Sequence, residues 1–534
     1  MTSVFARPNK FNLSHPNLIT CEMGDLVPFL TQEVLPGDEF RIKTDAQIRL
    51  APMLAPIYGE VDFYTHYFFV PNRLIWDNWE DFITNGLATG SSSAVKPYVI
   101  SPSGNANFKP GCLTDYMDYL VEDGMGTGGA TVADPYNVRQ DALPLRAYAK
   151  IYNDWYLSEF IGTPAALSTA DGLDSTTNLS LLKRCWPRDY MTSALPFVQL
   201  GSPVTLPAGA DNAPVYLDSP ATGLLDSTTI AMGTKQQARV YQNDYNSSVA
   251  GVNLVDKDNK LLTVSGSTVW AANLKADLSS AQAVTVNDMR TAFQLQRILE
   301  RKARSGNRYV EYLASAFGVR SADARLQRAE FLGGGKAPVM ISEVLQTSAG
   351  TATSPQGNMS GHGFGASRSF SVNKAFTEHG YIIGILSVMP KALYFQGRPR
   401  SLARWSWTDY YQPEFAHLGE QPLFKSELLG NATTAGSDTF AEGAVFGYQP
   451  RYEEYRRKVG SVHGDFRSNM AFWHVARAFT SAPALNADFI SCNPSKRIFA
   501  AGDQADRPCW IEMFLHISAI RPLPKKGTPG LIDH

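Results

Sequence analysis

The chain has 534 residues, of which 44% are hydrophobic and 11% aromatic, so it is long enough to bury a substantial core in more than one packing unit. Only 18% of the residues are charged and the formal net charge is −2, which excludes a protein that binds nucleic acid through its bulk charge but leaves room for a local basic patch. The five cysteines are scattered and form no CxxC pair, which argues against a disulfide framework and a zinc site and predicts free thiols.

The N-terminal part of the chain predicts an extended arm followed by strands. Residues 1–36 are polar and contain several prolines, without the apolar segment typical of a signal peptide. Residues 37–53 alternate between apolar and polar side chains, which predicts a strand with one buried face. Residues 60–70 are aromatic on both faces, which predicts a strand buried on both sides. A helix is then expected at residues 73–85.

The middle of the chain predicts two further helices on either side of a long insertion. Residues 144–160 have a proline at the first helical position, and residues 287–305 begin with a possible N-cap at Asn287. Residues 201–286 have few aromatic and few charged side chains, and their short β-prone runs predict a small β-rich outgrowth, with a disordered segment as the alternative. We therefore expect, in chain order, an extended arm, the first part of a β domain with helical insertions, a surface insertion, and a helical segment followed by the rest of the β domain and an extended tail (1–36, 37–200, 201–286 and 287–534).

The C-terminal half reads mainly as strands. Residues 380–389 are continuously apolar, as in a strand buried on both faces. Residues 506–520 alternate, with Cys509, Ile511, Met513, Leu515 and Ile517 on one face. Strands near both ends of the chain, with helices and long loops between them, predict an antiparallel β-sandwich of two sheets with large loop insertions.

A segment dense in arginine follows the third predicted helix. Residues 304–335 hold five arginines, Arg304, Arg308, Arg320, Arg325 and Arg328, against three acids. Within the segment, apolar residues at helical spacing end at Gly318, which predicts a short helix with a left-handed C-terminal glycine. Three carboxylates cannot pair with five guanidinium groups bidentately, so partners must come from other loops, another subunit or a polyanion.

The search for catalytic chemistry finds no motif. The nine histidines are scattered, and no nucleophile elbow, metal-binding pair or cofactor loop stands in its required context. We therefore expect no enzyme, no cofactor and no metal site. Composition alone also permits a carbohydrate-binding or carbohydrate-cleaving β-sandwich protein, and this alternative stays open at this point.

Two terminal segments have the composition of single-stranded nucleic acid contacts. Arg7 and Lys10 in the arm alternate with phenylalanines, which suits backbone charge combined with base stacking. Lys525 and Lys526 lie in a tail rich in proline and glycine. A solvated terminus, or a tie between subunits, is the alternative for both segments.

Several motifs together resemble one known family. The sequences LPGDEF (35–40), HYFFVPNRLIWDNWEDF (66–82), RDYMTSALP (188–196), EHGYIIGILSVMP (378–390), FAHLGEQP (415–422), VFGYQPRYEEYRRK (445–458) and PGLIDH (529–534), together with the arginine-dense segment and EVLQTS, are similar to the major capsid protein of the microviruses, small single-stranded DNA bacteriophages, especially the gokushovirus branch. Each motif is weak alone, but their shared order over most of the chain is specific. Residues 201–286 show no family motif.

The resemblance implies an eight-stranded viral jelly roll with large loop insertions. It also implies a structural protein of the virion, of which sixty copies, arranged in pentamers, assemble in the cytoplasm of the host bacterium into a T=1 icosahedral shell around circular single-stranded DNA. The implied partners are other copies of the chain, packaged DNA, a small basic DNA-binding virion protein and a pilot or minor spike protein. The position of residues 201–286 corresponds to an insertion that forms threefold protrusions in gokushoviruses and is expected to meet a host cell-surface receptor.

Such a shell needs contacts between subunits, which loops outside the sandwich would supply. We expect the five arginines of the arginine-dense segment to pair mainly between loops and between subunits, with genome contact second. We also expect Trp76, Trp79, Trp405 and Trp407 at or near subunit contacts. Burial of these tryptophans wholly within one subunit is the alternative.

Overall fold

The structure is a computed structural model that describes residues 8–84, 94–101, 105–121, 138–204, 285–345, 359–368, 371–430, 444–500 and 507–525, with the backbone of five short strands between 215 and 276. The chain divides into two compact units, Met1–Val198 with Ala303–His534, and Gln199–Lys302. No helix in the described ranges is both long and apolar enough to cross a membrane. Arg7 and Lys526 lie outside the described residues.

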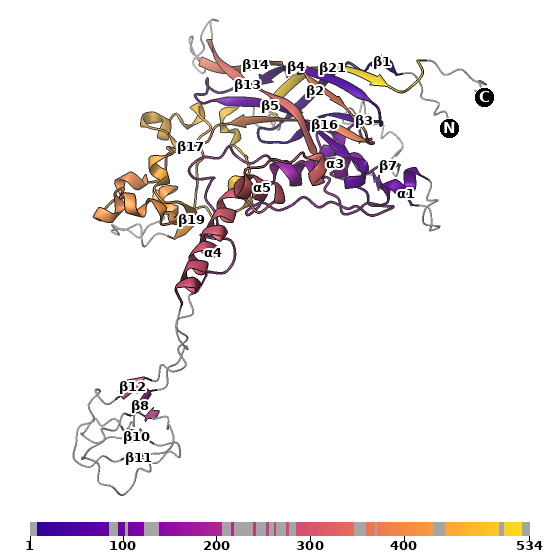
Figure 1. Ribbon diagram of the computed structural model, residues 1–534. Coiled ribbons are helices and arrows are strands. Elements are labelled where there is room, and N and C mark those ends of the chain that lie inside the picture. Colours follow the sequence, from indigo (N-terminus) through magenta and orange to yellow (C-terminus); the bar gives the residue numbers. More distant parts are fainter. Residues whose placement is uncertain are drawn as a thin grey trace. The chain divides into compact units, whose positions relative to one another are not determined.

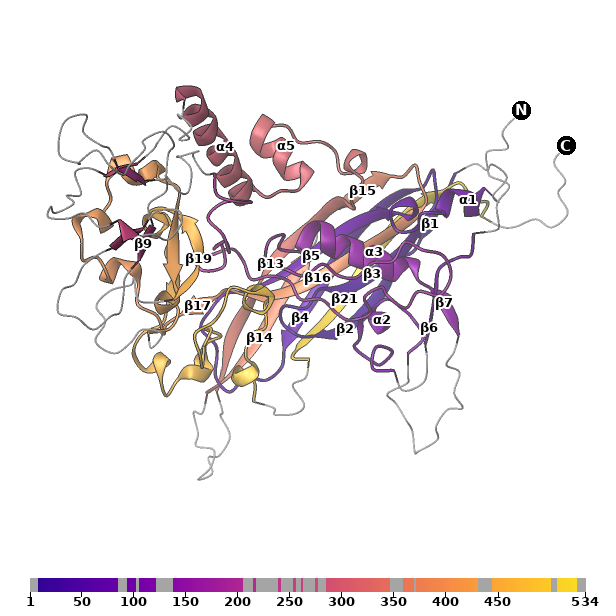
Figure 2. The same cartoon turned by 90° about the horizontal axis from the view of Figure 1, so that it is seen from below.

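The larger unit is built around one antiparallel sheet (Figures 1 and 2). Its ten strands are β1 Asn9–Asn12, β2 His15–Cys21, β3 Val27–Val34, β4 Glu39–Leu50, β5 Val61–Pro71, β13 Glu330–Leu345, β14 Met359–Arg368, β15 Val372–Ala375, β16 Gly380–Pro390 and β21 Cys509–Arg521. The smaller strand pairs of this unit are β6 Tyr98–Ile100 with β7 Arg139–Asp141, β17 Leu393–Tyr394 with β20 Gly460–Ser461, and β18 Glu420–Phe424 with β19 Val445–Pro450.

The ten strands occupy eight positions across the sheet. Both β1 and β2 pair with β21, and both β14 and β15 pair with β4, so each couple forms one interrupted strand. The order is β1/β2, β21, β4, β14/β15, β13, β5, β16 and β3. This arrangement confirms a mainly β protein, with the eight strands of a jelly roll and large loop insertions.

The two expected sheets are joined into one curled sheet by the long strand β13. Its residues 330–339 pair with β5, whereas residues 340–345 pair with β14, so this strand belongs to both halves. The two halves face each other across a core that includes Phe40 and Ile48 from β4, Phe63 from β5 and Leu515 from β21. The two facing halves form the predicted β-sandwich, and the 16-residue β13 is long enough to span both of them.

The strand predictions made from hydrophobic patterns are confirmed. Strand β4 alternates buried and exposed residues as expected, and β21 buries its odd-numbered face from Cys509 to Ile517. Strand β16 is buried along its whole length, and β5 is buried on both faces. Phe63 and Phe69 of β5 pack into the core between the two halves of the sheet, whereas Phe68 packs into a second cluster on the other side.

That second cluster is covered by helices and loops inserted between strands. Helix α3 (Leu143–Ile151) lies against β5 and β16, as Figure 2 shows. It continues into a π-helical turn, Tyr152–Tyr156, and so ends before the predicted residue 160. The other helices are α1 Trp79–Ile83, α2 Leu113–Tyr116, α4 Val286–Ser305, α5 Tyr309–Phe317 and α6 Ala487–Ile490.

Two helix predictions need correction in detail. Only a 3₁₀ turn, Asn72–Leu74, and the five-residue α1 occupy the region predicted as one helix at 73–85. Helix α4 has the predicted extent, but Thr285 rather than Asn287 caps it. The Thr285 hydroxyl accepts the N–H of Asp288 at 3.1 Å, and the Asp288 carboxylate accepts the N–H of Thr285 at 3.1 Å.

The five cysteines are free thiols, as predicted.

The smaller unit contains the insertion. Its described backbone includes β8 Val215–Leu217, β9 Arg239–Tyr241, β10 Asn253–Val255, β11 Leu261–Leu262 and β12 Leu274–Ala276. Strand β8 pairs with β12, and β10 pairs with both β9 and β11, all antiparallel. Short strands therefore occur in this part of the chain, whose sequence contains short β-prone runs.

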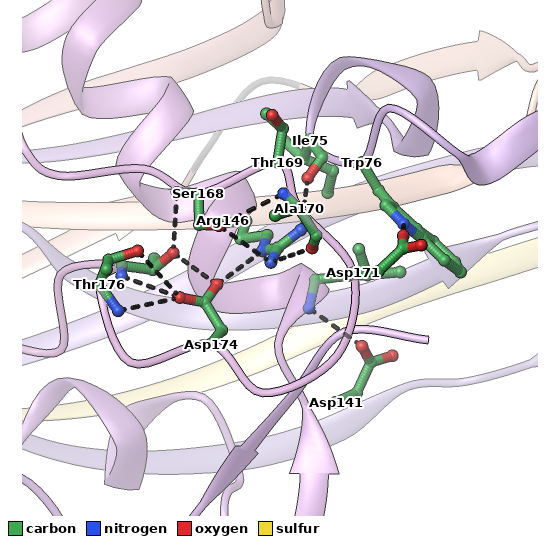
Figure 3. Close-up of polar contacts among 12 residues, drawn as sticks. Ile75, Trp76, Asp141, Arg146, Ser168, Thr169, Ala170, Asp171, Asp174 and Thr176 are labelled. Carbon is green, nitrogen blue, oxygen red and sulfur yellow. Dashed lines mark hydrogen bonds and ion pairs between the residues drawn. The ribbon is translucent and has the colours of Figure 1, made fainter. Parts of the chain in front are cut away.

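A buried ion pair fixes α3 to the loops around it (Figure 3). The Arg146 guanidinium donates through Nε to Asp174 Oδ2 at 2.7 Å and through Nη1 to the carbonyl of Ile75 at 3.1 Å. Both side chains are almost fully buried. Next to this pair, the indole N–H of Trp76 donates to Asp171 Oδ1 at 2.5 Å. The loop around residues 168–177 is thus tied to both α3 and the segment after β5.

Gly384 of β16 should not tolerate a larger residue. A Cβ at this position would lie 2.6 Å from Cζ of Phe29, inside the core. We expect Gly384→Ala to lower the free energy of unfolding by about 1–3 kcal/mol through overpacking. Denaturant titration of the single variant and of Gly384→Ala with Phe29→Leu tests this, because the smaller partner should recover part of the loss. Equal loss in both variants would contradict the steric explanation.

Candidate assembly surface

The arginine-dense segment forms the predicted helix, α5, and ends at Gly318. This glycine adopts φ 70°, a left-handed conformation that favours glycine, so the predicted C-terminal cap is confirmed. Val310 and Leu313 are partly buried, whereas Phe317 is exposed in the single chain. The apolar side of α5 is therefore only partly covered.

Two of the five arginines hold the end of the π-helical turn that follows α3. Arg308 donates to the carbonyls of Asn153 at 3.0 Å and of Asp154 and Leu157 at 3.2 Å each. Arg328 donates to the carbonyl of Asp154 at 3.2 Å, and its guanidinium lies 3.9 Å from the ring centre of Trp155. Cations are favourable at the C-terminal end of a helix, where carbonyl groups lack helical partners. Both guanidinium groups therefore have partners within the chain.

Of the other three arginines, one has a carboxylate partner and two are exposed. Arg304 lies 2.7 Å from the buried carboxylate of Glu420, at the start of β18. Arg320 and Arg325 are exposed, and no side-chain partner for either occurs among the described residues. The pairing between loops that we expected is therefore present for Arg304, Arg308 and Arg328, and two guanidinium groups stay available for another molecule.

The four tryptophans proposed at subunit contacts lie in two very different environments. Trp76 is 0% exposed, so a neighbouring subunit has no surface of it to contact. Trp79 is half-buried against the same cluster, with its ring 5.9 Å from that of Trp76. In contrast, Trp405 is 64% and Trp407 is 70% exposed. Only the second pair offers a large apolar surface for contact.

Trp405 and Trp407 belong to a wider group of exposed apolar side chains that we call the aromatic patch. All its members come from the turns between β17 and β18 or from the turn after β19, and each is more than half exposed: Leu402, Trp405, Trp407, Tyr410, Tyr411, Leu418 and Tyr455. Large exposed apolar groups of this kind are typical of protein–protein contacts, in which tryptophan, tyrosine and arginine are enriched.

A network of hydrogen bonds holds the aromatic patch in shape. The Asp409 carboxylate accepts the N–H groups of Trp405 at 3.0 Å and Ser406 at 2.8 Å, which closes a short turn between the two tryptophans. The hydroxyl of Tyr452 donates to the carbonyl of Tyr410 at 3.2 Å. The exposed rings therefore project from ordered turns, which lowers the entropic cost of binding a partner.

The half-buried Arg404 packs against two tyrosine rings of the aromatic patch. The Arg404 guanidinium lies 4.5 Å from the ring centre of Tyr455 and 5.5 Å from that of Tyr410. One of its nitrogens lies 3.4 Å from Glu454, whose other oxygen accepts a hydrogen bond from Gln421 at 2.9 Å. Arg404 and Glu454 were not predicted from the sequence. For Glu454 the only signal was the mixed run of arginine, acid and tyrosine at Tyr448–Lys458, which suits an interface and a solvated edge equally well, and Arg404 lies outside that run.

Glu427 is a buried carboxyl group that contacts both Tyr190 and Arg400, and Arg400 lies two residues before the aromatic patch begins at Leu402. Its Oε2 accepts a hydrogen bond from the hydroxyl of Tyr190 at 2.9 Å, and its Oε1 lies 3.5 Å from Arg400. Burial raises the pKa of Glu427 from its usual 4.5 to about 7, although the positive charge of Arg400 opposes the rise. The folded chain therefore binds this proton more tightly than the unfolded chain does.

The stability contribution of Glu427 should consequently fall as pH rises. It is fully present below the usual pKa of 4.5 and is lost as pH passes through about 7, with a total of about 3 kcal/mol in the free energy of unfolding. We expect Glu427→Gln to remove this part of the pH dependence in urea titrations at pH 5, 6.5 and 8. Glu60→Gln, which changes an exposed carboxylate, is the matched control. Equal pH dependence in both variants would refute the assignment.

The residues proposed to contact DNA are only partly described. Lys10 lies in β1, opposite Ile520 of β21, and its side chain is exposed. Lys525 is exposed at the end of the described chain, and Arg7 and Lys526 lie outside it. DNA contact through these four cations therefore stays a prediction. Within the described ranges, no group of three or more side chains could hold a metal ion.

The sequence is similar to known capsid proteins over almost its whole length. It is 35% identical to the capsid protein VP1 of Chlamydia phage 1, with 98% of this chain and 96% of that protein covered. It is also 35% identical to the capsid protein VP1 of Bdellovibrio phage phiMH2K, over 99% and 96%, and 28% identical to that of Spiroplasma virus 4, over 98% and 95%. The family described as "Capsid protein (F protein)" matches residues 1–531. With a mainly β fold and a recognised microvirus resemblance, this chain therefore belongs to the phage capsid protein (F protein) family.

Proposed function

We propose that this chain is the major capsid subunit of a gokushovirus-like microvirus and assembles, sixty copies in pentamers, into a closed T=1 shell around circular single-stranded DNA. The observation that carries the proposal is the match to capsid proteins over 98–99% of the chain. The family implies a structural role in the virion and contact between copies of the chain. Assembly would take place in the cytoplasm of the host bacterium.

The aromatic patch supports self-assembly through specific contacts. It offers two exposed indoles, several tyrosines and nearby arginines on ordered turns, the residue types that contribute most binding energy at interfaces. Arg320 and Arg325 are additional candidates, because they are exposed cations without a described partner. We propose that the aromatic patch and the two exposed arginines contact neighbouring subunits, and that the buried Trp76 does not.

Electrostatics support a separate partner that neutralises the genome. Sixty copies with a net charge of −2 carry a total of roughly −120, whereas packaged DNA adds one negative charge for every phosphate. The shell itself therefore cannot balance the charge of its contents. A small basic DNA-binding protein, polyamines or metal cations would supply the missing positive charge, and a pilot or minor spike protein would complete the particle.

The smaller unit supports a role in attachment to the host. Residues 201–286 interrupt the chain between two parts of the larger unit, so the insertion can vary without disturbing the main sheet. We propose that it forms a protrusion on the threefold axes and contacts a receptor on the bacterial surface. Removing residues 205–284 should then leave shell formation intact but abolish adsorption of particles to host cells.

Imaging of the purified wild-type chain tests the assembly proposal directly. Sedimentation and negative-stain microscopy should reveal closed particles of uniform diameter with a megadalton mass. The ratio of absorbance at 260 and 280 nm in particles purified from infected cells should show packaged nucleic acid, and nuclease digestion should identify it as single-stranded DNA. A chain that stays monomeric at all concentrations and salt conditions would overturn the proposal.

A further inference from the structure

One side of the sheet carries a regular array of exposed side chains that the family assignment does not explain. On β2, β21, β4 and β14, the residues that point away from the core form rows across the strands. One row runs from Thr20 through Trp510 and Arg49 to Phe364, and another from Pro16 through Phe514 and Asp45 to Arg368. We call this surface the open sheet face. In Figure 1 these strands form the upper side of the sheet, and the labelled helix α3 lies on the other side.

Three aromatic rings stand on the open sheet face. Trp510 is 46%, Phe514 42% and Phe364 40% exposed, although solvent exposure of such large rings gives no stability to the single chain. Trp510 and Phe514 are four residues apart on one strand, which corresponds to about 13 Å, and Phe364 lies two strands from Trp510, about 10 Å away. A few successive nucleotides can therefore reach all three rings.

Cations alternate with these rings. Arg49 lies between Trp510 and Phe364 in its row, and Lys43 and Arg41 continue along the same side of β4. Among the described residues, neither Arg49 nor Lys43 has an ion-pair partner. The Asp45 carboxylate, in the middle of the face, contacts Arg368 at 2.9 Å and His516 at 3.2 Å instead. The open sheet face thus offers positive charge next to aromatic rings, in a chain whose net charge is negative.

A groove beside Trp510 adds hydrogen-bonding groups. It has a volume of about 660 Å³, and its lining includes Trp510, Tyr116, two arginines, Arg49 and Arg507, and three carboxylates, Asp115, Asp118 and Glu512. Its size is within the range of small-ligand sites. The two arginines can contact phosphate, and Glu512 can accept hydrogen bonds from base amino groups.

We propose that the open sheet face is a binding platform for single-stranded DNA, in which bases stack on Trp510, Phe514 and Phe364 and phosphates contact Arg49 and Lys43. The inference rests on the proposed function, which supplies DNA as the contents of the shell. Exposed aromatic rings on a sheet bind unpaired bases, because stacking needs a free base face that a duplex does not offer. Lys10, opposite Ile520 at the edge of the same face, extends the platform.

The platform differs from the contact expected from sequence. Arg7, Lys10, Lys525 and Lys526 suggested DNA contact through the two termini, whereas the open sheet face is formed by residues that hydrophobic alternation simply marks as solvent-facing. Only the pairing of three strands distant in sequence, β21, β4 and β14, places Trp510, Arg49 and Phe364 in one row. Binding would be independent of base sequence, because stacking and phosphate contacts do not read base edges.

Fluorescence anisotropy with a labelled oligothymidylate of roughly 20 nucleotides, longer than common single-strand sites, tests the platform on the full chain before assembly. We expect Trp510→Ala with Phe514→Ala to weaken binding at least tenfold, since loss of one stacked base costs roughly 5- to 150-fold in affinity. Arg49→Gln should lower the slope of log affinity against log salt by about 0.7. A duplex of equal length should bind the wild-type chain more weakly than the single strand.

Controls separate this inference from the proposed function. Phe293→Ala removes an exposed ring of α4 in the smaller unit and should leave affinity unchanged. Trp510→Phe with Phe514→Tyr keeps both aromatic faces and should retain affinity within about threefold of wild type.

Normal shells with unchanged oligonucleotide affinity in the double alanine variant would overturn the platform and leave the capsid role intact. Lost assembly with unchanged affinity would also overturn it and make this face a contact between copies. A wild-type chain that binds DNA but never forms shells would instead contradict the proposed function.

Discussion

Replacing Asp174 by alanine should lower the free energy of unfolding by about 3–5 kcal/mol, because it leaves the buried charge of Arg146 without its partner. The two side chains are 0% and 1% exposed, so water cannot replace the lost carboxylate. Arg146 would keep only neutral partners, the carbonyls of Ile75 at 3.1 Å and Ala170 at 2.8 Å and the hydroxyl of Ser168 at 3.5 Å (Figure 3). Asp174 also accepts hydrogen bonds from Thr177, whose N–H and hydroxyl would lose their acceptor.

Denaturant titration of the unassembled chain, followed by tryptophan fluorescence, measures this loss. Glu60→Ala is the matched control, because the Glu60–Lys391 pair is exposed and such pairs contribute about 0–1 kcal/mol. The combined change of Arg146→Met and Asp174→Leu should cost less than Asp174→Ala alone, since it removes both charges together. A loss below about 1 kcal/mol for Asp174→Ala would show that the pair does not hold the loop to α3.

The same pair should make the larger unit sensitive to acid. Burial alone would raise the pKa of Asp174, but hydrogen bonds from Thr177 and Arg146 outweigh burial and hold its pKa below the usual 3.8. A lowered carboxyl pKa stabilises the fold above the usual value, and this stabilisation is lost as pH falls below it. The stabilisation by Glu427 changes with pH in the opposite direction, because it is lost as pH rises. The free energies of unfolding of Asp174→Ala and Glu427→Gln should therefore differ from that of the wild-type chain in opposite pH ranges.

Trp405→Ala combined with Trp407→Ala should prevent shell formation while leaving the subunit folded. Both indoles are exposed in the single chain, so their removal creates no cavity in the core. Tryptophan contacts at the centre of an interface commonly contribute at least about 2 kcal/mol, which corresponds to roughly 30-fold in the dissociation constant of each contact. Because every copy in a closed shell repeats the same contacts, the losses combine and assembly should fail at ordinary protein concentrations.

Sedimentation analysis measures this effect, and circular dichroism verifies that the variant subunit keeps its strands. Phe293→Ala is again the matched control, since it removes an exposed ring outside the aromatic patch. Arg320→Glu and Arg325→Glu should weaken assembly less, because exposed charge contacts contribute little on their own. Normal shells from the double tryptophan variant would exclude the aromatic patch as a subunit contact.

Several elements were predictable because local patterns decide them. The alternation in β4 and β21, the continuous burial of β16 and the glycine that ends α5 follow from backbone geometry and from which residues avoid water. The helix predicted at 73–85 is wrong in extent: a 3₁₀ turn and the short α1 occupy this region, and Trp76 between them donates a hydrogen bond to Asp171 in a distant loop. Tertiary contacts there outweigh helical propensity.

The sequence by itself determined the family, the mainly β class and the burial of individual strands, since motif order and hydrophobic period are properties of neighbouring residues. Only the tertiary structure decided which tryptophans are buried, which arginines already have partners, and which cations and rings share the open sheet face. The physical reason is that each of these properties depends on pairs far apart in the chain, such as Arg146 with Asp174, Arg304 with Glu420 and Arg49 with Trp510. Local patterns place residues on a face, but the pairing of distant strands and loops determines what that face meets.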